Sequence, residues 1–167
     1  MQAYFDLVAG VLDSQVGYAN AKPQYIKNLS YEVVCSGLSG AVEAVEIDFD
    51  EGILSLDSLL TRFFSIINPT SINQQGNDIG TQYRSGIYAL DERILAHAKD
   101  FIACNVAPKI ALKTSLTTPH LTTPPPIATE VLPLSNFTPA ESYHQKYLAK
   151  NPNGYCHIDI KKATKPL

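Results

Sequence analysis

The chain contains no tryptophan, one methionine and only three cysteines. Thiols at positions 35, 104 and 156 are too few and too scattered for a disulfide scaffold, and no two of them have the spacing of metal ligands. An odd number of thiols in a reducing compartment leaves redox chemistry open. Charge is also scarce, since charged residues make up 17% of the chain and the net charge is −3. This mild balance gives no electrostatic case for binding nucleic acid or an anionic membrane.

Long apolar runs are absent as well. No stretch approaches the ~20 apolar residues of a membrane span, and the start, Met1-Gln2-Ala3-Tyr4, does not have the pattern of a secretory signal. We therefore expect a cytoplasmic protein without membrane or nucleic-acid partners. With 167 residues, of which 45% are hydrophobic, the chain is long enough to bury a sizeable core in a single domain, residues 1–167.

Hydrophobic periodicity predicts the order of the secondary structure. Helices are expected at 2–10, 55–67, 93–105 and 139–150, and strands at 11–19, 41–49, 83–90 and 127–134. The Thr- and Pro-rich residues 107–126 are expected to form a loop, and the residues after 151 a long irregular C-terminal tail. Helices interspersed with the strands of one small mixed sheet predict an α+β, two-layer sandwich.

Residues 77–85 hold the densest group of chemically useful side chains: an acid, two amides, a phenol and a guanidinium. Gly76 and Gly80 flank Asp78 at positions where a residue without Cβ allows a tight turn. The alternation that follows predicts a strand, which would fix Asp78 and Tyr83 at the edge of a sheet. Asp78 by itself is explained equally well as an Asx-turn residue that accepts hydrogen bonds from local amides.

Glu43 has an unusual place in the strand predicted at 41–49. It falls in phase with Val45, Ile47 and Phe49, which alternate on the apolar face. A carboxylate on such a face is either paired with a cation or kept partly protonated by desolvation, and the second state is what a general acid requires. The alternative, that Glu43 lies at the end of the strand and reaches water, remains open from the pattern.

Residues 77–85, with Asn68-Pro69-Thr70 and Gln75-Gly76 ahead of them, resemble the signature of the A-type peptide methionine sulfoxide reductases. The resemblance continues in the family's order from nearly the first residue to nearly the last. It takes in Tyr4-Phe5-Asp6, Gly17-Tyr18-Ala19-Asn20, Tyr31-Glu32-Val33-Val34-Cys35-Ser36-Gly37, Glu43-Ala44-Val45, Phe63-Phe64, Tyr143-His144-Gln145-Lys146-Tyr147-Leu148 and Asn151-Pro152-Asn153-Gly154-Tyr155-Cys156. It implies a two-layer α+β sandwich and thiol-dependent reduction of methionine-S-sulfoxide, free or in proteins.

The resemblance also implies roles for five residues. Glu43 would be the acid, Tyr31 and Tyr83 would hydrogen-bond the sulfoxide oxygen, Asp78 would position the pocket, and Cys156 would be the resolving thiol. Thioredoxin or another dithiol would be the reductant, and no metal or organic cofactor would be needed. We expect a monomer, and the resemblance of the tail to that of fused reductases hints at a fused or partner methionine-R-sulfoxide reductase.

One departure from the family pattern concerns the chemistry directly. The family's nucleophile lies in a Gly-Cys-Phe-Trp motif just ahead of the helix that here begins the chain, and this sequence contains no such motif. We therefore predict an N-terminally truncated domain that is inactive alone. One alternative is a non-catalytic pseudoenzyme or binding module for oxidised methionine. In another, Cys35 or Cys104 replaces the nucleophile, although Cys104 is more simply explained as a small buried hydrophobe.

Overall fold

The computed structural model describes residues 1–118, 120, 123–156 and 158–166. The strands are β1 (Val11–Ala19), β2 (Val42–Phe49), β3 (Gln74–Gln75), β4 (Asp78–Ile79), β5 (Gly86–Ala89), β6 (Glu130–Pro133) and β7 (Phe137–Pro139). The α-helices are α1 (Gln2–Phe5), α2 (Tyr31–Cys35), α3 (Leu56–Ile66), α4 (Glu92–Phe101), α5 (Ala107–Thr117) and α6 (Tyr147–Lys150). Shorter turns are the 3-10 helices η1 (Pro23–Asn28), η2 (Thr81–Tyr83) and η4 (Ile160–Thr164) and the π-helix η3 (Ile102–Val106). The predicted α+β class is confirmed.

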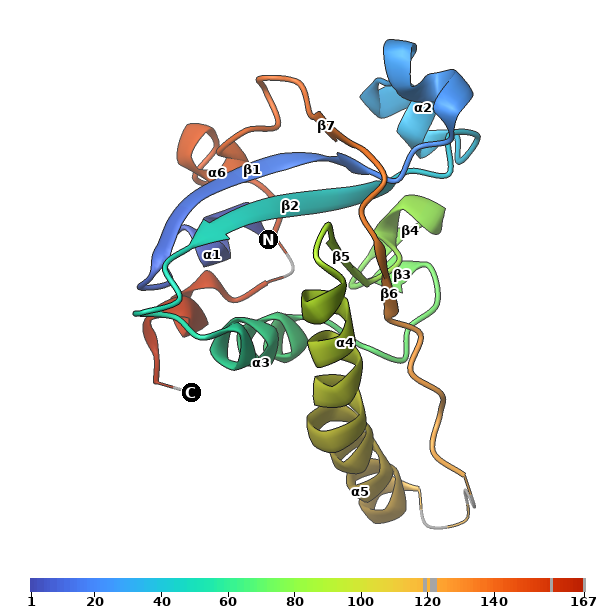
Figure 1. Cartoon of the computed structure of the whole chain (residues 1–167), viewed down its shortest axis with the longest axis vertical. Coiled ribbons are helices and arrows are strands. Elements are labelled where there is room, and N and C mark those ends of the chain that lie inside the picture. Colours follow the sequence, from blue (N-terminus) through green and yellow to red (C-terminus); the bar gives the residue numbers. More distant parts are fainter. Residues whose placement is uncertain (119, 121–122, 157, 167) are drawn as a thin grey trace.

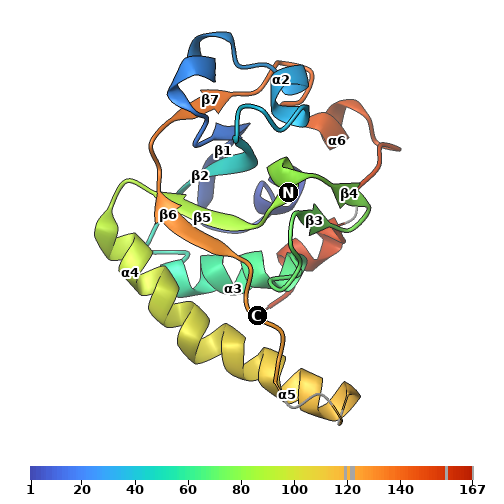
Figure 2. The same cartoon turned by 90° about the vertical axis from the view of Figure 1, so that its right-hand side faces the viewer.

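The long antiparallel ribbon of β1 and β2 is the centre of the molecule (Figure 1). β7 pairs antiparallel with the other edge of β1, so the order of this sheet is β2-β1-β7. The remaining strands form two small sheets, the β3–β4 hairpin and the parallel pair β5–β6 (Figure 2). The strands predicted at 11–19 and 41–49 are confirmed to within one residue, but the strands of the described chain are divided among three sheets instead of one.

Helix α3 connects two parts of the hydrophobic core. Ser55 caps its N-terminus by accepting a hydrogen bond from the amide of Ser58 at 3.2 Å. One side of the helix packs against a cluster built from α1 and the C-terminal turn, and the other side packs against α4. The first side carries Leu59, Phe63 and Ile66; the second carries Leu56, Leu60 and Phe64. The amphipathic pattern of this helix was therefore a correct prediction of core.

The prediction of a loop over residues 107–126 is wrong for its first half. The helix expected to end at Asn105 continues through η3 into α5 and ends only at Thr117. Pro108 lies in the first turn of α5, directly after the π-helix η3, and is accommodated at this change of helix type. Figures 1 and 2 show that α4 and α5 run on in one direction and carry the chain away from the central ribbon.

Two further helix predictions are too long. The first helix ends at Phe5 rather than near Gly10, where the chain turns with a positive φ of 94°. Of the helix expected at 139–150, only α6 forms, because the side chain of Gln145 is engaged elsewhere. Its amide accepts from the N–H of Val16 at 3.0 Å and donates to the C=O of Val16 at 2.7 Å, so it pairs with β1 as a strand would.

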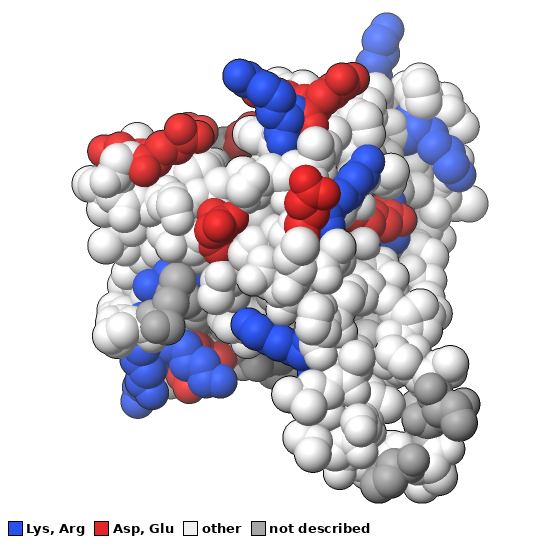
Figure 3. All heavy atoms as spheres, turned by 60° about the horizontal axis from the view of Figure 1, so that its bottom comes forward, with Lys and Arg blue, Asp and Glu red and all other residues white. Residues whose placement is uncertain are grey.

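Among the described residues, no helix is both long and apolar enough to cross a membrane. On the face drawn in Figure 3, acidic and basic side chains are interspersed rather than gathered into one patch of a single sign.

Candidate active site

Four of the five predicted site residues lie together where β2, α2 and η2 meet. The hydroxyl of Tyr83 acts on Glu43 as a hydrogen-bond donor, and the charge of Asp78 reaches Glu43 as well. Tyr31 lies within hydrogen-bonding reach of Tyr83. The prediction that Tyr83 begins a strand is wrong, because β5 begins only at Gly86 and Tyr83 ends the 3-10 turn η2. This turn, rather than a strand, directs the Tyr83 phenol toward Glu43.

Glu43 lies within β2 and is half-buried. Its Oε1 atom is buried and has no hydrogen-bond partner among the described residues, so the alternative in which the carboxyl simply reaches water does not hold. Burial, followed by the nearby charge of Asp78, raises the pKa of Glu43 from 4.5 to about 7, and the Tyr83 hydroxyl offsets part of this rise. A carboxyl with such a pKa holds a transferable proton near neutral pH.

Both phenols beside Glu43 remain protonated. Burial and the charge of Glu43 raise the pKa of Tyr83 above its usual value. The pKa of Tyr31 is raised further, first by a hydrogen bond to Cys35 and then by burial. Each hydroxyl is therefore a neutral donor that can stabilise an oxygen atom as it gains negative charge.

Helix α2 brings a thiol to the edge of this cluster. Ser30 caps the helix by accepting from the amide of Val33, and Tyr31 and Cys35 follow four residues apart on one face. The structure places the exposed thiol of Cys35 against the Tyr31 hydroxyl. Cys104, expected to be buried, is exposed on η3, so that prediction is wrong.

The β3–β4 hairpin places Asp78. Asp78 pairs with Gln75 across a tight turn in which Gly76 has a positive φ of 61°. Gly80 follows with φ 153° and ψ 159°, a backbone conformation that is open essentially only to glycine. The two glycines singled out in the sequence thus hold the turn that brings Asp78 toward Glu43.

Replacing Gly80 by alanine should lower the free energy of unfolding by about 1–2 kcal/mol, because the new Cβ would enforce a disfavoured backbone and collide with the buried Gln82 amide. Urea unfolding monitored by circular dichroism measures the change. Gly52→Ala is the matched control, since Gly52 has no positive φ and its Cβ would meet only an exposed carboxylate. Equal losses in the two variants would contradict the role given to Gly80.

Arg84 fixes the η2 turn against β2. Its guanidinium donates to the Thr81 carbonyl at 2.8 Å and to the Gly40 carbonyl, just ahead of β2, at 3.0 Å. It also forms an ion pair of 3.1 Å with Glu130 on β6. The sequence indicated a guanidinium in this stretch without a role, and the structure shows that it holds the turn carrying Tyr83 beside the strand carrying Glu43.

Cys156 lies with α1 rather than with α2. Its side chain packs against the cluster of Tyr4 and Phe5, and its Sγ donates to the carbonyl of Ile158 at 3.4 Å. The amino group of Met1 is close enough for the charge of Cys156 to act on it, although burial dominates and lowers the pKa of that amine. The predicted resolving thiol therefore lies next to the N-terminus of the chain.

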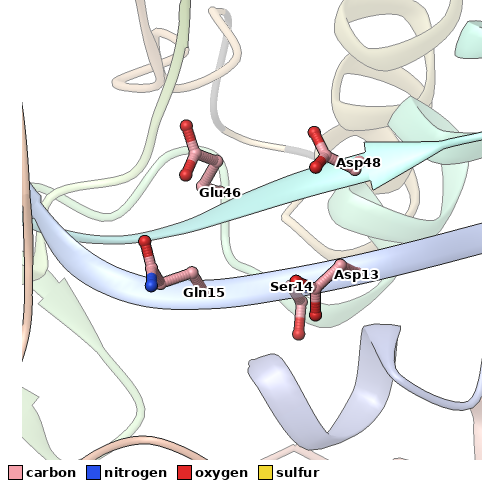
Figure 4. A pocket seen from close by; sticks show the side chains of 5 residues that line it. All are labelled: Asp13, Ser14, Gln15, Glu46 and Asp48. Atoms are coloured by element: carbon pink, nitrogen blue, oxygen red, sulfur yellow. The ribbon is translucent and has the colours of Figure 1, made fainter.

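Two hollows on the surface lie elsewhere. A small one of about 80 Å³ is lined by Asp13, Ser14, Gln15, Glu46 and Asp48 on β1 and β2 (Figure 4). An open groove of about 690 Å³ lies between the end of α3 and α5. Neither is lined by any of the predicted site residues. Within the described part of the chain, no three His, Cys, Asp or Glu side chains are placed to hold a metal ion.

Sequence reasoning missed the turn at residues 141–144, which lies against the cluster. Glu141 accepts hydrogen bonds from the Tyr31 amide and the Tyr18 hydroxyl, and His144 packs on the Tyr31 ring. The only sequence signal was that His144 belongs to one of the segments shared with the family, since periodicity indicated nothing more than a helix here.

Comparisons with known proteins show the family of the chain. The family model "Peptide methionine sulfoxide reductase" matches residues 1–167. The chain is 48% identical over 160 residues to peptide methionine sulfoxide reductase MsrA of Clostridium botulinum strain Hall. This alignment covers 96% of this chain and 91% of that protein. It is 44% identical over 160 residues to the MsrA of Mycoplasma pneumoniae, and that alignment covers 94% of this chain and 89% of the relative.

Solved structures show the same fold. Methionine sulfoxide reductase A of Corynebacterium diphtheriae superimposes with a TM-score of 0.79 and 33% identity, covering 93% of this chain and 71% of that one. Mxr1 of Saccharomyces cerevisiae in reduced form gives a TM-score of 0.73, also at 33% identity, covering 88% and 75%. On the sequence match over its whole length and the shared fold, this chain belongs to the peptide methionine sulfoxide reductase family, a family of oxidoreductases.

Proposed function

We propose that this site reduces methionine-S-sulfoxide when a nucleophilic thiol is supplied by a Gly-Cys-Phe-Trp segment ahead of Met1. The observation that carries the proposal is the Glu43 carboxyl, whose buried Oε1 has no partner among the described residues and whose pKa is raised to about 7. A proton held in this way, beside the Tyr83 hydroxyl, suits an oxygen acceptor that becomes more basic during reaction.

The chemistry balances with two thiols. A thiolate attacks the sulfoxide sulfur while Glu43 protonates the oxygen and Tyr31 and Tyr83 donate hydrogen bonds to it. The protonated oxygen then passes to the attacking sulfur as its bond to the substrate sulfur and the transient S–S bond break, so methionine leaves and the thiol becomes a sulfenic acid. The Cys156 thiol then attacks the sulfenic sulfur, a disulfide forms and water departs. A dithiol such as thioredoxin reduces that disulfide, so each sulfoxide consumes two electrons, and no metal or organic cofactor takes part.

The position of Cys156 supports this pairing. Its thiol lies close to the Met1 amine, which is where a preceding segment would join the chain. Asp78 supports the acid role of Glu43, because a second carboxylate nearby makes ionisation of the first less favourable.

A thioredoxin-coupled NADPH assay with methionine-S-sulfoxide tests the proposal. Residues 1–167 alone should show no turnover, because an acid and two phenols cannot supply two electrons. The same chain preceded by a segment with Gly-Cys-Phe-Trp should turn over and form a disulfide to Cys156, and the matched segment with Gly-Ser-Phe-Trp should not.

Other results would give different answers. Turnover by residues 1–167 that is lost in Cys35→Ser would assign the nucleophile to Cys35, whose thiol already lies against Tyr31. Sulfoxide binding without turnover, even after the thiol is supplied, would favour a binding module for oxidised methionine. The observation that favours this binding function is the group of one acid and two phenols, which can bind a sulfoxide oxygen without reducing it.

A further inference from the structure

We propose that Glu141 is the positioning residue that sets the place of Tyr31 in the site. Glu141 lies in the turn after β7, far from Tyr31 in sequence, and touches it through the backbone rather than through the phenol. The inference rests on the proposed function only for the role of Tyr31 as a hydrogen-bond donor to the sulfoxide oxygen. The contact between Glu141 and Tyr31 does not depend on that role.

The Glu141 carboxylate joins its own turn to two elements, α2 and β1. Its Oε1 accepts from the backbone N–H of Tyr31, the first residue of α2, at 2.9 Å. Its Oε2 accepts from the hydroxyl of Tyr18, near the end of β1, at 2.7 Å. Tyr18 is only 2% exposed and pairs directly across the ribbon with Glu43. One side chain therefore fixes α2 relative to the strand pair that carries the acid.

Glu141 acts here as a charged acceptor. Burial disfavours its charge, but hydrogen bonds from Tyr18 and the Tyr31 amide outweigh burial and leave the pKa of Glu141 below its usual value. The pKa of Tyr18 is raised, first by burial and then by its hydrogen bond to Glu141. This phenol therefore stays protonated and acts as the hydrogen-bond donor to the carboxylate. Hydrogen bonds to an ionised acceptor are shorter and stronger than neutral ones.

The same turn also holds the Tyr31 ring. The imidazole of His144 packs on that ring with centroids 4.7 Å apart and planes at 51°. The amide of His144 donates to the carbonyl of Glu141 at 2.9 Å, which keeps both contacts in one rigid turn. Helix α2 has only five residues and is too short to be stable without outside contacts. The direction of the Tyr31 hydroxyl thus depends on the 141–144 turn.

NMR of residues 1–167 with labelled tyrosine tests the inference. In Glu141→Ala, the Tyr31 ring resonances should shift and the cross-peaks between the Tyr31 and Tyr83 rings should weaken. In Glu141→Gln both should stay near the wild type, because the amide oxygen can accept from the Tyr31 N–H while the amide nitrogen donates to the Tyr18 oxygen. Glu46→Ala, which removes an exposed carboxylate on the outer face of β2, is the matched control and should change neither.

A merely structural role predicts a different pattern. A lower melting temperature in Glu141→Ala with unchanged Tyr31 resonances and cross-peaks would overturn the inference. If the alanine variant does not fold, Tyr18→Phe replaces it, since it removes one of the two hydrogen bonds to the carboxylate. Tyr31 should then shift in part, and an unmoved Tyr31 would likewise overturn the inference.

Titration with a peptide containing methionine-S-sulfoxide separates this inference from the proposed function. Binding by the wild type that is weakened about three- to tenfold in Glu141→Ala, the effect of losing the Tyr31 hydrogen bond to the neutral sulfoxide oxygen, supports both. No binding by the wild type, even with the Gly-Ser-Phe-Trp segment in place, together with a displaced Tyr31 in the alanine variant, would refute the proposed function and leave the positioning role supported.

Discussion

Replacing Glu43 by glutamine is expected to raise the free energy of unfolding by about 2–3 kcal/mol at pH 8 and to leave it unchanged at pH 4. The pKa of Glu43 is raised from 4.5 to about 7 by burial and by Asp78. The folded chain therefore binds this proton more tightly than the unfolded chain, and stability falls as the pH rises between these two values. Glutamine keeps the shape and never ionises, so the variant avoids that loss.

Urea unfolding of the wild type and the variant at a series of pH values measures the difference. Glu46→Gln is the control, because Glu46 lies on the same strand but is exposed, and its curve should follow the wild type at every pH. A Glu43→Gln variant that is less stable than the wild type at pH 8 would show that the carboxylate is stabilised in its charged form. The acid role given to Glu43 would then be wrong.

The sequence placed Glu43 on the correct strand but left its environment undecided. An alternation of period two shows which face a side chain takes, and Val45, Ile47 and Phe49 were enough for that. Whether the end of that face is covered depends on η2, some forty residues later, and on the Arg84 contacts that hold η2 against Gly40. Local periodicity contains no information about a contact of that range.

The errors in the helix predictions have two origins. Residues 107–117 have a composition that suggests a loop, yet Pro108 is accommodated in the first turn of α5, directly after the π-helix η3. Residues 139–146 have helical periodicity, yet Gln145 pairs its side-chain amide with Val16 and the chain takes a left-handed residue at Lys146. In the second case a tertiary contact overrides local propensity, which is a weak determinant.

In the chain preceded by the Gly-Cys-Phe-Trp segment, Glu43→Gln is expected to lower kcat for methionine-S-sulfoxide by roughly 10²–10⁴-fold. This is the usual contribution of a general acid. The sulfoxide oxygen must be protonated as it passes to the attacking sulfur to give the sulfenic acid, and an amide cannot supply that proton. Tyr83→Phe should cost about 10²-fold or more, because it removes one donor to the same oxygen. Tyr147→Phe, which changes an exposed phenol on α6, is the control and should have no effect.

The pH dependence of kcat separates the acid from the donor. The activity of the chain that carries the Gly-Cys-Phe-Trp segment and is otherwise wild type should fall above about pH 7, because Glu43 loses its proton there. The Tyr83 hydroxyl favours the charged form of Glu43, so its removal in Tyr83→Phe should raise the pKa of Glu43 further. The decline in activity should therefore move to higher pH in this slower variant, because the acid keeps its proton longer. A decline that stays at the same pH in Tyr83→Phe would mean that the group titrating in the reaction is not Glu43.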